Sequence, residues 1–147
     1  MIAVLQRVER SSVKVDGELV GSIETGLTIL LGIVKGDDES HLDRLLSRIP
    51  YLRIFQDEKG KMNRSLEEIG GAALVVSQFT LASDLSRGRR PSFDGAMPPK
   101  EAERLYDLFC HELAKIVPVE TGRFGAMMEV EILNDGPVTF ILDSREI

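Results

Sequence analysis

The sequence predicts an α+β fold in which a mainly antiparallel β-sheet curls into a barrel-like core and two amphipathic helices cover it. Three observations support this prediction. Apolar, β-branched segments of strand length outnumber the segments with helical periodicity. Most of these segments are separated by turns too short for a crossover, so neighbouring strands should pair antiparallel. Only two stretches repeat apolar residues at the spacing that a helix packed on a sheet requires.

The amino-terminal third is predicted to be a β-meander. Residues 2–8 are apolar and β-branched, and the segments on either side of Asp16-Gly17 have the pattern of a hairpin. Residues 27–34 are almost wholly apolar, which is typical of a strand that is covered on both faces.

Two amphipathic helices follow from the 3.6-residue period. The first is expected after a turn and cap at Gly36 to Asp38, and Pro50 should end or kink it. The second should start near Pro98-Pro99, since proline is favoured in a first turn. The predicted inward residues are Leu42, Leu45, Leu46 and Ile49 in the first helix, and Ala102, Leu105, Leu108, Phe109, Leu113 and Ile116 in the second.

The remaining segments are predicted to be strands. Residues 51–55, a turn at 57–60 and residues 72–79 continue the β pattern. Near the carboxyl end, Asn134-Asp135-Gly136-Pro137 predicts a tight turn between two segments of alternating hydrophobicity, so the chain should close with an antiparallel hairpin.

Composition sets limits on location and function. With 147 residues and 43% hydrophobic content, we expect one domain spanning residues 1–147. The net charge of −6 excludes a general positive field for nucleic acid, so any RNA contact should be local. A lone Cys110, no membrane-length apolar run and no signal-peptide pattern favour a cytoplasmic protein. No Cys and His cluster predicts a metal site, and we expect no cofactor.

A conventional catalytic dyad is not predicted. Cys110 and His111 are neighbours on a helix, so their side chains point about 100° apart. His41 lies in an exposed first turn without a nucleophile beside it. Paired carboxylates such as Asp37-Asp38 are interpreted as ordinary solvated caps.

The polar cluster Ser77-Gln78-Phe79-Thr80 is more informative, because it follows directly after an apolar strand. Binding groups are commonly held where a strand leaves the core. Ser77 or Thr80 is either a nucleophile or a hydrogen-bond partner of the backbone where the strand stops, and the missing base favours the second alternative.

Seven segments together resemble the D-aminoacyl-tRNA deacylase family, in order and nearly from end to end. SQFTL at 77–81 and NDGPVT at 134–139 resemble its two active-site signatures, and they are far more specific together than alone. The other segments are MIAVLQRV, YLRIF, GKMN, RPSF and TGRFGA. Met127 stands where the family pattern leads us to expect a more polar residue.

The resemblance implies hydrolysis of the ester that joins a D-amino acid, or glycine, to the 3′ end of a tRNA. It implies catalytic roles for Ser77, Gln78, Phe79 and Thr80, and a homodimer in which a cis Gly136-Pro137 turn reaches into the partner's pocket to select the substrate's handedness. Supporting residues are Arg7 and Asn134, and possible tRNA contacts are Arg87, Arg89, Arg90 and Arg123.

Three alternatives stay open at the level of sequence. Arg7 either helps hold the Gly-Pro turn or is a solvent-facing strand residue. A small serine or threonine esterase with Thr80 as its nucleophile is a rival from the same broad class. A non-catalytic RNA-binding or assembly module is a rival from another class, although only 5% of residues are aromatic.

Overall fold

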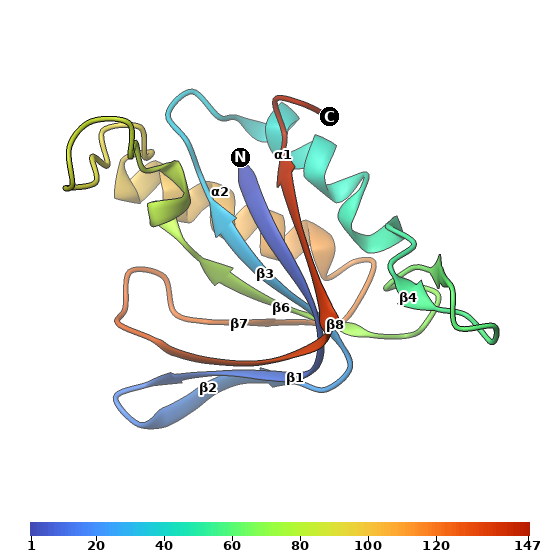
Figure 1. The fold of residues 1–147 in the computed structure, drawn as a ribbon. Coiled ribbons are helices and arrows are strands. Elements are labelled where there is room, and N and C mark those ends of the chain that lie inside the picture. Colours follow the sequence, from blue (N-terminus) through green and yellow to red (C-terminus); the bar gives the residue numbers. More distant parts are fainter.

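The structure, a computed structural model, describes residues 1–147. Its strands are β1 (Ile2–Val15), β2 (Glu18–Ile23), β3 (Gly26–Gly32), β4 (Phe55–Gln56), β5 (Met62–Arg64), β6 (Ala72–Ser77), β7 (Val119–Thr121) and β8 (Glu129–Asp143). Its helices are α1 (Glu39–Leu46) and α2 (Pro99–Leu113), together with the short 3-10 helices η1 (Ile49–Tyr51) and η2 (Phe79–Ala82). The two α-helices pack on one side of the sheet, which confirms the predicted fold class (Figure 1).

The main sheet is curled until its two ends approach each other. Its strand order is β2-β1-β3-β6-β7, with β8 paired to β1, while β4 and β5 form a separate two-stranded sheet. The close approach of β2 to β7 is visible at Gly21, where an added Cβ atom would lie 2.4 Å from the carbonyl oxygen of Thr121. The predicted barrel-like core is therefore a nearly closed sheet.

Two strand pairings differ from the expected antiparallel arrangement. β6 runs parallel to β3 and to β7, and each of these pairs is joined by a long connection that includes a helix. Parallel strands need such crossovers and are covered on both faces. This explains why β3 and β6 are buried almost without interruption.

The carboxyl end is a single long strand, so the predicted terminal hairpin is wrong. Both halves of β8 pair antiparallel with β1, from Ile2↔Asp143 to Lys14↔Glu129. Between Val8↔Asn134 and Gln6↔Thr139, β1 contributes only Arg7 while β8 contributes residues 135–138. The turn-forming residues of β8 therefore form a large β-bulge within the strand. We call residues 134–138 the Gly-Pro bulge.

The core lies between the helices and the sheet. The predicted inward residues Leu42, Leu45, Leu105 and Phe109 are almost completely buried in it. Asp38 caps α1 through its side chain, as predicted, and α1 ends at Leu46, with Pro50 in η1. Neither α1 nor α2 has the length and hydropathy of a membrane-spanning helix.

Asp37 is not the solvated cap that the sequence suggested. Its carboxylate is buried, lies 2.7 Å from the Met1 ammonium and accepts a hydrogen bond from the Val34 amide. The same ammonium donates to Ser144 Oγ at 2.6 Å. An ion pair that is excluded from solvent thus fixes the start of β1 against the loop before α1 and the residues that follow β8.

Candidate active site

The carboxyl end of β6 opens into a cavity with a volume of about 880 Å³. Ser77, Gln78, Phe79 and Thr80 all line it. Most of the other lining side chains are apolar and come from the loops before α2 and after β7. They include Phe93, Met97, Phe124, Met127 and Met128.

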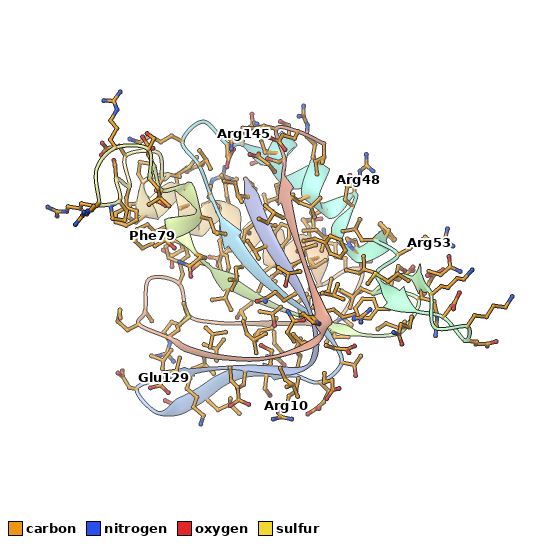
Figure 2. All side chains as sticks on the ribbon, viewed as in Figure 1. Arg10, Arg48, Arg53, Phe79, Glu129 and Arg145 are labelled. Atoms are coloured by element: carbon orange, nitrogen blue, oxygen red, sulfur yellow. The ribbon has the colours of Figure 1, made fainter.

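Aromatic side chains at the cavity are only partly covered. Phe79 is 57% exposed and packs edge to face against Phe93, with ring centroids 5.1 Å apart. Figure 2 shows Phe79 on the side of the molecule away from Arg53. Met127 is 91% exposed at the same cavity. Apolar side chains this open to solvent commonly mark a binding surface.

Hydrogen bonds hold the backbone of this segment in place. The amide of Gln78 donates to Leu31 O, which extends the pairing of β6 with β3 by one residue, and the amide of Leu81 donates back to Gln78 O. The side chains of Gln78 and Thr80 contact each other through Nε2 and Oγ1. Phe79 and Thr80 are the first residues of η2, so no preceding helical turn offers a carbonyl acceptor to their amides. Neither amide donates in any of the loop or side-chain hydrogen bonds. Both residues line the cavity, so their amides are candidate donors to a bound group.

The imidazole and thiol groups do not form a catalytic pair with this cluster. His41 Nδ1 lies 2.8 Å from Asp38 Oδ1 as part of the cap of α1. Cys110 is largely buried, and this burial raises the pKa of its thiol to about 12. The thiol is therefore protonated at neutral pH. No group of three or more His, Cys, Asp or Glu side chains is arranged to hold a metal ion.

The Gly-Pro bulge is held by a buried arginine, so the solvent-facing alternative for Arg7 is wrong. Arg7 is 4% exposed, and its Nε donates to Asp135 O at 3.1 Å while Nη1 donates to Ile54 O at 2.7 Å. Asn134 accepts a hydrogen bond from the amide of Val138 at 2.8 Å and so closes the bulge from within. The Gly136-Pro137 peptide bond is cis, and both residues are exposed.

Within one chain the structure does not bring the bulge to the cavity. In the sheet register, Arg7 aligns with Leu27, and Leu27 with Ala73, four residues before Ser77. The bulge on β8 and Ser77 on β6 are therefore separated by three strand spacings across the sheet and by four residues along it. This separation corresponds to about 20 Å on the sheet surface. Neither Gly136 nor Pro137 lines the cavity of its own chain.

The predicted tRNA-contacting arginines are all on the surface. Arg87, Arg89 and Arg90 lie in the exposed loop that the Asp84↔Ser92 bridge closes, and Arg123 lies in the exposed segment after β7. Phe93 and Phe124, which line the cavity, lie close to these two groups in the chain. Sequence reasoning did not assign these aromatic residues to the site, although they occur in the segments RPSF and TGRFGA.

Comparison with known proteins gives a consistent result. A family model described as D-Tyr-tRNA(Tyr) deacylase matches residues 4–143. A D-aminoacyl-tRNA deacylase of Persephonella marina is 58% identical over 147 residues, which is the full length of both chains. A solved structure described as c-Myc DNA unwinding element binding protein is 42% identical with a TM-score of 0.93, covering 97% of this chain and 98% of its own. A structure of a probable eukaryotic D-amino acid tRNA deacylase, 19% identical with a TM-score of 0.83 over 97% of this chain and 98% of its own, shares the fold.

Proposed function

This chain belongs to the D-Tyr-tRNA(Tyr) deacylase family, and we propose on that basis that it hydrolyses the ester joining a D-amino acid to the 3′ end of a tRNA in the cytoplasm. One observation carries the proposal beyond family membership. The SQFTL signature lies on a large, mostly apolar cavity, and two of its residues, Phe79 and Thr80, begin a 3-10 helix whose first amides have no acceptor within the helix. The −6 net charge argues against a general affinity for duplex DNA.

In the proposed mechanism, the amides of Phe79 and Thr80 stabilise the oxyanion that forms on the ester carbonyl. An aminoacyl ester has an activated carbonyl and a good leaving group, so positioning a water molecule is the main remaining task. The terminal ribose hydroxyl of the tRNA assists that water. This mechanism needs no side-chain base, which fits the position of His41 in a helix cap and the raised pKa of Cys110.

Replacing Thr80 separates this mechanism from a nucleophilic one. We expect Thr80→Ala to retain measurable turnover, because the backbone amide is kept and only the contact with Gln78 is lost. Single-turnover hydrolysis of D-tyrosyl-tRNA measures the effect. Complete loss of activity in a folded Thr80→Ala protein would instead assign the attack on the ester to the threonine hydroxyl.

We also propose that the active enzyme is a homodimer in which each Gly-Pro bulge reaches the partner's cavity. The bulge is exposed, held by Arg7, and too far from the cavity of its own chain. The adjoining part of β8 is an edge strand that leaves Phe140 39% and Ile141 73% exposed. Successive strand residues point to opposite faces, so neither face of β8 is fully covered here. A second copy would cover this apolar surface.

Selection by handedness follows if the bulge accepts the substrate's α-ammonium group on its main-chain carbonyl oxygens. With the ester carbonyl held at Phe79 and Thr80, two substituents of the α-carbon are fixed. A D side chain then points to open space, whereas an L side chain collides with Pro137 and is excluded. Glycine has no side chain to exclude, so glycyl-tRNA is a substrate as well.

Hydrolysis of matched tRNA esters tests the proposed function. We expect the purified protein to release D-tyrosine, and to release L-tyrosine from the same tRNA at least about 100-fold more slowly. Glycine should also be released. Cleavage of both tyrosyl enantiomers at similar rates, or sparing of glycyl-tRNA alone, would contradict the steric account. Equal hydrolysis of a free D-tyrosine ester would favour a general esterase instead.

Contact with RNA is proposed to be limited to the acceptor end. Arg87, Arg89, Arg90 and Arg123 are exposed and close in sequence to cavity-lining aromatic residues, so they are placed to bind phosphates of a tRNA whose terminal nucleotide enters the cavity. Few contacts of this kind predict a shallow dependence of binding on salt.

A further inference from the structure

A second group of basic side chains gathers on the β4–β5 hairpin. Between residues 51 and 64 the sequence has four basic and two acidic side chains, in a protein whose net charge is negative. We call the four basic residues, all of them exposed, the hairpin cations; they are Arg53, Lys59, Lys61 and Arg64. In Figure 2, Arg53 lies on the opposite side of the molecule from Phe79.

The hairpin cations form no salt bridge with a carboxylate. Arg53 donates to the backbone and side-chain oxygens of Asn63, and Arg64 donates to the carbonyl oxygen of Glu68. Asp57, the nearest acidic residue in the turn, accepts hydrogen bonds from the amides of Lys59 and Lys61. These contacts hold the hairpin in shape and leave its cations without a direct ion pair. Hydrogen bonds from Ser65, together with the charges of Arg53 and Arg64, lower the pKa of Glu68.

Several cations elsewhere on the surface are paired with carboxylates. Arg10 lies 3.6 Å from a carboxylate oxygen of Glu131, and Lys115 lies 2.6 Å from one of Glu112. Arg104 and Arg145 have similar partners. A set of unpaired cations is the expected feature of a surface that binds phosphate groups.

Arg7 joins the hairpin to the Gly-Pro bulge. One guanidinium group donates to Ile54 O, next to Arg53, and to Asp135 O, next to Gly136. A Cβ atom on Gly136 would lie 3.3 Å from Nη2 of the same group. The bulge and the base of the hairpin are therefore neighbours in space, although about 80 residues separate them in sequence.

We infer that the hairpin cations of one subunit bind phosphates of the tRNA whose aminoacyl end occupies the partner's cavity. This inference rests on the proposed function, because a bulge that enters the partner's cavity carries its own hairpin to the rim of that cavity. The ligand is the sugar-phosphate backbone of the acceptor stem, whose helical grooves offer phosphate and ribose groups for contact. Each tRNA would then be held by both subunits.

Charge reversal at the hairpin tip tests the inference. We expect Lys59→Glu with Lys61→Glu to lower kcat/KM for D-tyrosyl-tRNA roughly tenfold at low salt, and to make the slope of log kcat/KM against log salt shallower by about 2, one for each lost contact. Hydrolysis of 3′-D-tyrosyl-adenosine, which lacks the stem phosphates, should be unchanged. The matched control is Arg10→Glu with Lys14→Glu, which alters the net charge equally on exposed positions of β1.

Mixed dimers test whether the contact is made across the interface. Ala126→Trp fills the cavity but leaves the hairpin intact, whereas the hairpin variant keeps its cavity. In a mixed dimer the intact cavity faces the unaltered hairpin of the other subunit, so mixing the two proteins should restore tRNA deacylation. Hairpin variants as active on tRNA as the control, or no gain on mixing, would overturn the inference. Failure of the unaltered protein to cleave D-tyrosyl-tRNA would overturn the proposed function itself.

Discussion

Gly136→Ala is expected to lower kcat/KM for D-tyrosyl-tRNA by about 100-fold or more, since a displacement of 1 Å in a positioning group has an effect of that size. Gly136 has φ +136°, which side-chain-bearing residues rarely adopt. An added Cβ would also lie 2.6 Å from Val138 Cγ2 and 3.0 Å from the Val138 amide nitrogen. The bulge must therefore change shape, and with it the proposed contact with the substrate ammonium.

A matched glycine variant separates this effect from general backbone strain. Gly17 also has a positive φ, but an added Cβ there has no neighbour within 4 Å. Gly17→Ala should lower the free energy of unfolding by about 1 kcal/mol and leave kcat/KM unaltered. Circular dichroism should show a native fold for both proteins. A fully active Gly136→Ala enzyme would mean that the bulge takes no part in substrate recognition.

Ile141→Glu is expected to produce a monomer with little deacylase activity. Ile141 is 73% exposed on an edge strand, and a carboxylate there should prevent a second copy from packing on it. Analytical ultracentrifugation should give the mass of one 16.3 kDa chain for the variant and twice that mass for the unaltered protein. Activity should recover partly as enzyme concentration rises, because association supplies the missing bulge.

The control variant introduces a glutamate at another exposed apolar position of a strand. Leu19 is 55% exposed on β2 and lies outside β8, so Leu19→Glu should remain dimeric and active. A stable monomer of Ile141→Glu with full activity would show that a single chain completes its own site. An unaltered mass for Ile141→Glu would place the subunit contact on another surface.

Local features of the fold were predictable because their causes are local. Asp16-Gly17 forms the β1–β2 turn with φ values of 51° and 78°, as such a pair favours. Asp38 caps α1, and α2 begins at Pro99 as proline preference predicts. The SQFTL segment follows a buried strand, so its position at a strand end was also evident.

Long-range pairing was not predictable from one sequence. The parallel alignment of β3 with β6 joins residues more than 40 positions apart. No residue type in either segment indicates which strand will be its partner. Turn-forming residues occur in bulges as well as in hairpins, so NDGP gave no indication that β8 continues past it. The buried partner of Asp37 is a backbone terminus, which has no pattern in the sequence.

The pairing of the first strand with the last has a consequence for biosynthesis. β1 is synthesised early, but its partner β8 spans residues 129–143 and is synthesised more than 110 residues later. At a synthesis rate of roughly 5–20 residues per second, one edge of β1 has no partner strand for about ten seconds. The sheet therefore stays incomplete throughout that interval, and the nascent protein needs protection from aggregation.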